Sequence, residues 1–247
     1  MQRSLAKAEQ PFSESDPAKG FAVVELFTSQ GCSSCPPADA VLKELVQEAE
    51  TQHQNVFALS FHVDYWNSLG WKDPYSSKRF SERQRRYAEA FHSDNIYTPQ
   101  MIVNGQAEFV GSSSTKAHQY VHEALAATPS LSLSAQQASS MPSSGNVRVQ
   151  FAVSARQAHS TLICIALVRN VEPVSVTAGE NSGRKLSHTH VVRAFETQSL
   201  KDLEGTLDVH LPSEAPQTLP LSAYRAIVYL QDGVTMKVIA ATSVALR

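Results

Sequence analysis

Two cysteines lie where the chain changes from one kind of secondary structure to another. An apolar strand pattern over residues 21–27 gives way to a helical pattern over residues 38–49, and Cys32 and Cys35 lie between them. Thiolates are stabilised by the unpaired amide N–H groups and the partial positive charge at a helix N-terminus. The position of the cysteines therefore predicts a redox site.

Pro36 and Pro37 indicate that the helix begins directly after the second cysteine. Proline is tolerated in the first helical turn, but the residue before a proline resists the helical conformation. We therefore expect Cys32 to lie just outside the helix as the nucleophile and Cys35 to act as the resolving thiol. The two serines between them can donate hydrogen bonds to a thiolate.

Other uses of a CxxC pair stay open at this point. Zinc sites need a second pair of Cys or His ligands, and the sequence has no second CxxC. Cys164 lies in an apolar run and is expected to be a small core residue. One alternative is a non-enzymatic module that binds a soft metal, Cu(I) for instance, through both cysteines and His62. The other is an interaction protein whose thiol pair is dormant.

The segments that follow extend the redox interpretation. A second strand pattern at residues 56–63 precedes a helical stretch at 76–91, and Thr98-Pro99 leads into another strand. A proline that enters a central strand requires a special geometry, so Pro99 fits a cis peptide bond. Asn104-Gly105 predicts a hairpin, and a helix over residues 113–127 completes the order of a thioredoxin-like α/β domain.

Several motifs resemble a poorly characterised thioredoxin-like family, the domain of unknown function 1223. The main one is VELFTSQGCSSCPPAD at residues 24–39, and the others lie at residues 61–67, 70–73, 97–100, 179–184 and 190–193. The resemblance spans nearly the whole chain. It implies a thioredoxin-like fold, a cis-proline loop at Thr98 and Pro99 that holds an incoming peptide or mixed disulfide, and secreted or periplasmic relatives.

Candidate side chains near the thiols each have a structural alternative. Glu25 interrupts the first strand and could shuttle a proton to the resolving thiol, or form structural hydrogen bonds. His62 ends the second strand on the same side as Asp64, and is either a thiolate partner or base, or a core histidine. Trp66 belongs to an aromatic loop that either grips an extended substrate or forms the loop's own small core.

The composition narrows the range of partners. A formal net charge of −2 with interspersed signs predicts neither a nucleic acid nor an anionic membrane as partner. We expect a protein or small-molecule thiol or disulfide as substrate, with no cofactor and no metal. Residues 1–20 lack an apolar signal-peptide core, which by itself indicates the cytoplasm, whereas the family resemblance suggests a periplasmic or secreted protein.

A change of pattern near residue 130 predicts two domains. Residues 128–145 are rich in Ser, Ala, Gln, Pro and Gly, and the later chain has short strand patterns at 147–153, 162–168, 190–195, 207–211, 226–230 and 237–244. We therefore predict a mobile tail at 1–19, a thioredoxin-like domain at 20–129 and an antiparallel β-sandwich at 130–247. Residues 179–184 are expected to form a long hairpin loop that can lean over the redox site.

Overall fold

The structure, a computed structural model, describes residues 19–138, 146–155, 160–211 and 219–247. Almost all of the tail predicted at residues 1–19 lies outside this part of the chain. The helices are α1 (Pro36–Gln52), α2 (Lys78–Ala90) and α3 (Ser114–Ala126), with short 3-10 helices η1 (Tyr65–Leu69) and η2 (Leu221–Ala223). The strands are β1 (Ala22–Thr28), β2 (Val56–His62), β3 (Gln100–Val103), β4 (Ala107–Val110), β5 (Leu133–Gln137), β6 (Asn146–Val153), β7 (Thr161–Ser175), β8 (Lys185–Ser199), β9 (Glu204–His210), β10 (Arg225–Asp232) and β11 (Val238–Ala245).

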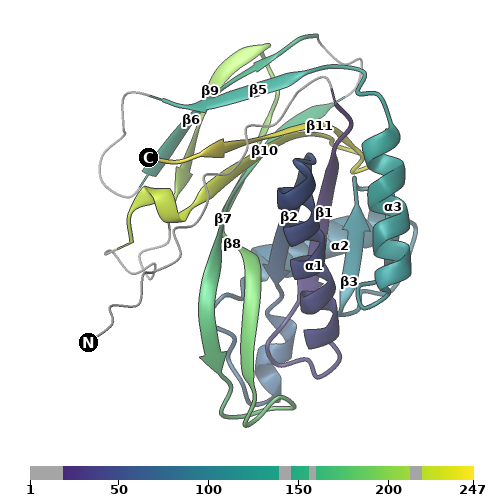
Figure 1. Cartoon of the computed structure of the whole chain (residues 1–247), viewed down its shortest axis with the longest axis vertical. Coiled ribbons are helices and arrows are strands. Elements are labelled where there is room, and N and C mark those ends of the chain that lie inside the picture. The colour runs from purple at the N-terminus through teal and green to yellow at the C-terminus, as the bar shows by residue number, and fades with distance from the viewer. Residues whose placement is uncertain (1–18, 139–145, 156–159, 212–218) are drawn as a thin grey trace.

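Strands from both halves of the chain form one mixed sheet. Its eight strands run in the order β11-β10-β7-β8-β2-β1-β3-β4, and β5, β6 and β9 form a separate three-stranded sheet (Figure 1). Strand β1 is parallel to β2 and antiparallel to β3. The two halves of the large sheet meet where β2 pairs with β8, at Ser60 and Val191.

This continuous sheet corrects the fold class expected from the sequence. The expectation of a thioredoxin-like α/β domain followed by a β-sandwich is wrong, because the described chain is mostly β, with eleven strands and three α-helices, and β8 continues the sheet that contains β1 and β2. Strand patterns show that a segment is extended, but they do not show which strand edges join. The boundary near residue 130 stays a prediction, and it falls between α3 and β5.

Alternation along β1 assigns its side chains to two faces. Val24 and Leu26 belong to the apolar cluster that α1 and α3 cover, whereas Val23 and Phe27 belong to the cluster on the opposite face. Because successive side chains of a strand point to opposite faces, Thr28 lies on the α1 side and Glu25 on the other. The same rule places His62 of β2 on the α1 side.

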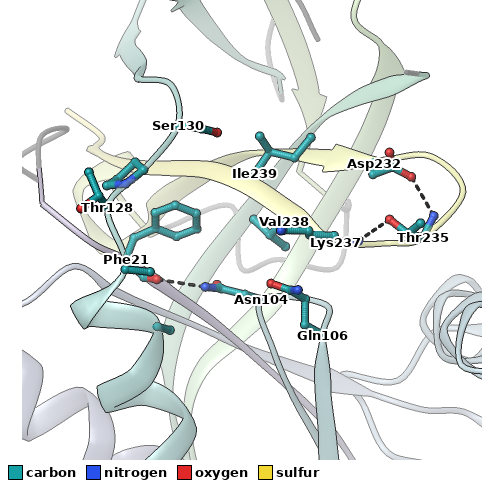
Figure 2. A pocket seen from close by; sticks show the side chains of 13 residues that line it. Phe21, Asn104, Gln106, Thr128, Ser130, Asp232, Thr235, Lys237, Val238 and Ile239 are labelled. Carbon is teal, nitrogen blue, oxygen red and sulfur yellow. Dashed lines mark hydrogen bonds between the residues drawn. The ribbon is translucent and has the colours of Figure 1, made fainter. Parts of the chain in front are cut away.

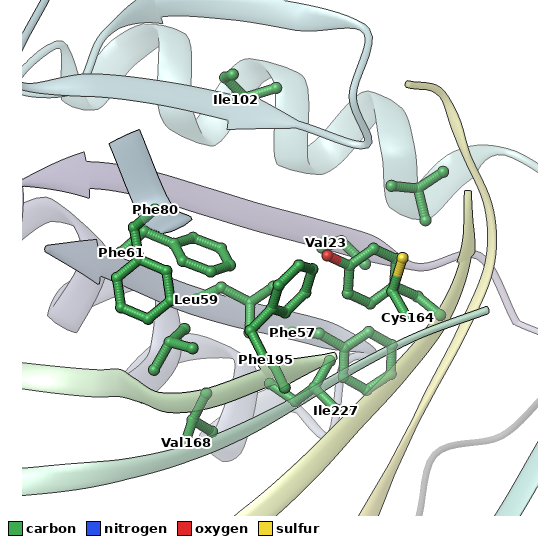
Figure 3. Packing of buried hydrophobic residues seen from close by; sticks show 14 of the residues in the cluster. Val23, Phe57, Leu59, Phe61, Phe80, Ile102, Cys164, Val168, Phe195 and Ile227 are labelled. Carbon is green, nitrogen blue, oxygen red and sulfur yellow. The ribbon is translucent and has the colours of Figure 1, made fainter. Parts of the chain in front are cut away.

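Aromatic side chains fill the core on the face opposite α1. Figure 3 shows Phe61 beside Phe80 of α2 and Phe195 of β8, with ring centroids 5.1 and 5.4 Å from Phe61. The buried Cys164 of β7 belongs to the same cluster, as predicted for a core residue. This cluster includes side chains from both halves of the chain, so the two halves share one core on this face of the sheet.

The Asn104-Gly105 hairpin is confirmed between β3 and β4 and docks on the start of β1. The Asn104 amide accepts a hydrogen bond from Val23 N–H at 2.7 Å and donates one to the Phe21 carbonyl at 3.0 Å. Gly105 has φ 63°, and a Cβ there would lie 1.9 Å from the Met236 oxygen. Figure 2 shows the pocket of about 380 Å³ beside this hairpin. It lies at the end of β1 opposite to the cysteines.

Candidate active site at the Cys32–Cys35 disulfide

Cys32 and Cys35 are joined by a disulfide at the start of α1. Their Cα atoms are 5.4 Å apart, and both residues are buried. Helix α1 begins at Pro36 with Cys35 as its N-cap residue, and the Ala38 N–H donates to the Cys35 oxygen at 2.9 Å. Cys32 therefore lies just outside the helix, as the sequence predicted.

A chain of hydrogen bonds ends on the Cys32 sulfur. The Trp66 indole N–H donates to the Thr98 hydroxyl oxygen at 2.7 Å, and the Thr98 hydroxyl donates to Cys32 Sγ at 3.4 Å. The peptide bond between Thr98 and Pro99 is cis, which confirms the geometry predicted for Pro99. Ser34 Oγ lies 3.3 Å from the same sulfur. Trp66, Thr98 and Cys32, which are far apart in sequence, thus form one contact group.

Amide donors contribute less to this site than the sequence suggested. The Cys35 N–H donates to the Cys32 carbonyl at 3.2 Å, and the two prolines that follow have no N–H. The Ser33 N–H donates to the Glu180 carboxylate at 2.9 Å. Hydrogen bonds from the Ser33 hydroxyl and the Ser33 N–H hold the pKa of the exposed Glu180 carboxyl below its usual range. A negative charge therefore lies beside the CxxC turn. Hydroxyl groups remain the side-chain donors nearest to the Cys32 sulfur.

The tip of the β7–β8 hairpin, residues 176–184, contacts the CxxC turn from the second half of the chain. Figure 1 shows this hairpin reaching the end of the molecule where α1 begins. The buried Asn181 side chain donates to the Gln30 and Cys32 carbonyls at 2.9 and 2.8 Å, and Arg184 donates to the Asn181 side-chain oxygen at 2.9 Å. The predicted hairpin loop is confirmed, but Arg184 acts on the turn through Asn181.

His62 lies in a buried polar cluster beneath the turn. Its Nδ1 is 2.7 Å from the Asp73 carboxylate, which also accepts the Gln30 N–H at 2.8 Å. Burial alone would raise the pKa of Asp73, but the His62 ring and N–H donors outweigh burial and lower the pKa. Asp73 therefore connects His62 to the segment that carries Cys32.

A second His–Asp pair lies beside the first. His188 Nδ1 is 3.5 Å from the Asp39 carboxylate, and the His62 and His188 ring centroids are 4.6 Å apart. Burial disfavours the charged imidazolium, but Asp39 outweighs it and raises the pKa of His188. Asp39 lies one helical turn after Cys35 and also accepts a hydrogen bond from Thr28 at 3.4 Å. Sequence reasoning did not select Asp39, His188 or Asn181 as site residues. Asp39 and Asn181 nevertheless lie within the family motifs at residues 24–39 and 179–184.

Glu25 lies away from this cluster, on the opposite face of the sheet. Its carboxylate pairs with the buried Arg83 of α2 at 2.6 Å and accepts the Tyr87 hydroxyl at 2.5 Å. Arg83 also donates to the Tyr229 hydroxyl of β10 at 2.9 Å. Glu25 therefore has the structural hydrogen-bonding role that was the alternative to a proton shuttle. Its carboxylate, on the opposite face of the sheet, makes no contact in the described chain that would carry a proton to Cys35.

Possible metal ligands gather elsewhere. Among the described residues, one group of three or more His, Cys, Asp or Glu ligand atoms lies within 4.8 Å of one another, and it consists of Glu44, Glu48 and His118. Glu44 and Glu48 lie more than two turns along α1 from Cys35. The geometry thus offers no support for a copper site that combines the cysteines with His62.

Comparison with known sequences places this arrangement in a family. The sequence profile of a family described as protein of unknown function, DUF1223, matches residues 23–231. The chain belongs to the DUF1223 family. This confirms the family inferred from the motifs, whereas a periplasmic or secreted location stays a prediction. Among curated proteins, none matches this DUF1223 chain.

Two solved structures share the arrangement of the DUF1223 chain. One is the X-ray crystal structure of a protein from Agrobacterium tumefaciens, with 29% sequence identity and a TM-score of 0.60. The match covers 90% of this chain and 92% of that chain. HBP35 of Porphyromonas gingivalis is 14% identical over 92% of this chain and 76% of that chain, with a TM-score of 0.62. The second likeness shows the fold alone. None of the helices in the described ranges is long and apolar enough to cross a membrane.

Proposed function

We propose that this protein is a thiol–disulfide oxidoreductase whose working group is the Cys32–Cys35 pair. The hydrogen-bond chain from Trp66 through Thr98 to the Cys32 sulfur carries the proposal. The indole N–H occupies the Thr98 oxygen as an acceptor, which directs the hydroxyl proton to Cys32. Such a donor favours the thiolate of the reduced enzyme over the thiol, and the thiolate is the nucleophile.

The reaction follows thiol–disulfide exchange. The Cys32 thiolate attacks one sulfur of a substrate disulfide, so a mixed disulfide forms and the other substrate sulfur leaves as a thiolate. Cys35 then loses its proton and attacks Cys32 Sγ, which releases the second substrate thiolate. The substrate gains two electrons and takes up two protons, and the cysteines lose the same two electrons as their disulfide forms.

The Asp39–His188 pair is the proposed acceptor for the Cys35 proton. Asp39 is buried one helical turn from Cys35, and its amide N–H donates to the Cys35 carbonyl at 3.1 Å. A carboxylate paired with an imidazole can take up a proton without leaving an isolated charge in the interior. Glu25 has no part in this step, because its carboxylate is held by Arg83 on the other face.

The substrate is proposed to approach over the exposed serines of the CxxC turn. Ser33 and Ser34 are exposed, whereas both cysteines are buried behind them. The Thr98-Pro99 segment lies beside the Cys32 sulfur and is the proposed binding surface for the substrate chain. The Trp66 indole supports this segment through its hydrogen bond to Thr98. A protein or small-molecule disulfide fits this approach, and Glu180 adds a negative charge that favours basic substrates.

A cysteine variant series tests the proposal. The reduced wild-type protein should cleave a small aromatic disulfide far faster than Cys32→Ser, and Cys35→Ser should accumulate a mixed disulfide detectable by mass spectrometry. Cys164→Ser is the matched control, because this thiol is buried and burial raises its pKa to about 12, so its loss should leave the rate unchanged. Equal rates for wild type and Cys32→Ser would refute the proposal and favour a dormant thiol pair.

A further inference from the structure

A second pocket, built without either cysteine of the CxxC pair, lies on the strands of the second half of the chain. Its volume is about 470 Å³. Side chains from β7, β8, β10, η2 and the loop before α2 line it, among them Tyr75, Arg169, Asn170, His190, Leu219 and Arg225. A pocket of this size accommodates a small organic molecule.

The strand pairing is distorted where the pocket forms. The β7–β8 register passes from Ala194 to Val192 along β8, so Arg193 is an extra residue without a partner on β7. Further along β8, His190 has φ 48° and its N–H donates to the Asn170 side chain at 3.1 Å. Such bulges redirect side chains and often lie beside functional sites. His190 lines the pocket, and Arg193 lies beside it, stacked on the lining residue Tyr75.

Two guanidinium groups beside the pocket have hydrogen-bonding capacity that the protein does not use. Arg193 stacks on Tyr75 with 4.8 Å to the ring centroid, and Arg169 stacks on Tyr224 with 5.8 Å. Stacking leaves the edge of each planar group available to an acceptor. The Nε atoms of Arg169 and Arg193 are buried, and within the described ranges neither has a hydrogen-bond acceptor.

Charge neutralisation is missing as well. Neither Arg169 nor Arg193 forms an ion pair with a carboxylate in the part of the chain that the structure describes. Burial, together with the positive charge of Arg169, lowers the pKa of Arg193. Glu172, which is exposed, is the carboxylate among the residues that line the pocket. With Arg225, which also lines the pocket, three positive charges gather here. Like charges so close together are unfavourable by themselves, and a bound anion would offset their repulsion.

We propose that this pocket binds a small oxyanionic ligand, with a carboxylate or phosphate group held by Arg169 and Arg193. Both groups match the planar guanidinium, which can donate two parallel hydrogen bonds to either. Leu219, an exposed apolar residue on the pocket wall, offers apolar contact to the remainder of an organic anion. The site is independent of the proposed redox function, since it uses neither Cys32 nor Cys35.

Calorimetric titration tests the site with two probes, inorganic phosphate and succinate, at constant ionic strength set with sodium chloride. We expect saturable binding of at least one probe to the full chain. Saturation by phosphate alone identifies a phosphate site, and saturation by succinate alone identifies a carboxylate site. Because the site lacks the cysteines, the same binding is expected for the Cys32→Ser variant.

Matched variants separate this site from general charge attraction. Arg169→Gln and Arg193→Gln should each weaken binding roughly tenfold or more, the loss expected for a charge-assisted hydrogen bond. Arg86→Gln makes the same charge change at an exposed position of α2 and should have no effect. Ser222→Trp, at an exposed lining residue, should block the pocket without touching the charges. The proposal fails if neither probe saturates, or if Arg86→Gln weakens binding as much as Arg169→Gln.

Discussion

The side-chain amide of Asn181 donates a 2.8 Å hydrogen bond to the carbonyl oxygen of Cys32, 149 residues earlier in the chain. The β7–β8 hairpin thereby fixes the turn that carries the candidate nucleophile. Asn181 is fully buried, and Arg184 holds its side-chain oxygen. The second half of the chain is therefore part of the candidate site.

Replacing Asn181 should loosen the CxxC turn. Asn181→Ala leaves the buried Gln30 and Cys32 carbonyls without their donor, so we expect a loss of about 1–3 kcal/mol in the free energy of unfolding. Hydrogen exchange of residues 29–33 should accelerate, and the rate of disulfide reduction should fall. Ser182→Ala at the same hairpin tip is the control, since Ser182 is exposed and its hydroxyl donates to the Thr177 carbonyl within the tip. Unchanged exchange in Asn181→Ala would contradict this role.

Removing the Thr98 hydroxyl should reduce thiolate formation. Thr98→Val keeps the side-chain shape but deletes the donor to Cys32, and we expect roughly a tenfold lower fraction of thiolate at neutral pH. Ultraviolet absorbance of the thiolate during a pH titration measures this. Trp66→Phe should have a smaller effect, because the Thr98 hydroxyl remains and only its orientation is freed. A larger effect for Trp66→Phe than for Thr98→Val would contradict the hydrogen-bond chain.

Neutralising Glu180 should act in the opposite direction. The carboxylate takes the Ser33 N–H and places negative charge beside the turn, both of which oppose a thiolate at Cys32. Glu180→Gln should therefore increase the thiolate fraction and shift the pair to a more oxidising reduction potential. Equilibration with glutathione buffers measures the potential. Because Glu180 is exposed, the shift should shrink at high salt, and a shift that is independent of salt would argue against a charge effect.

The Glu25–Arg83 pair should matter for stability and not for catalysis. Glu25→Gln leaves the buried Arg83 charge uncompensated, at a cost of about 3–5 kcal/mol in the free energy of unfolding, measured with urea. The rate of disulfide reduction per folded molecule should stay unchanged. Asp208→Asn breaks a surface pair with Arg148 and should have little effect. A slower reaction in folded Glu25→Gln would restore the proton-shuttle role.

His190 should make the protein less stable in mild acid. Burial, with a contribution from Arg225, lowers the pKa of His190 to about 4, whereas an unfolded histidine titrates near 6.5. As the pH falls between these values the unfolded state binds a proton that the folded state does not, so stability falls. Between pH 7 and pH 5 the loss is roughly 2 kcal/mol. His190→Asn, which tolerates the positive φ, should lose less stability over this range in urea unfolding experiments; an equal loss would exclude His190 as the cause.

Sequence patterns predicted the elements and much of the candidate site. The prolines after Cys35 marked the helix start, Asn104-Gly105 marked a hairpin, and the family motifs contained most residues that contact the disulfide. These features are local, because proline geometry, turn chemistry and side-chain periodicity act over a few residues. The partner of Glu25 was not predictable, since alternation assigns a face to a side chain but does not say which helix covers that face.

The tertiary structure alone decided how these elements combine. Pairing of β8 with β2 joined strands from both halves of the chain in one sheet, and this pairing brought Asn181 to Cys32 and His188 to Asp39. A strand edge offers the same N–H and C=O groups to any partner, so its sequence does not specify the neighbour. The sequence by itself thus determined that the thiols lie at a strand-to-helix turn and that a helix begins directly after Cys35. Long-range packing determined which polar groups surround the thiols.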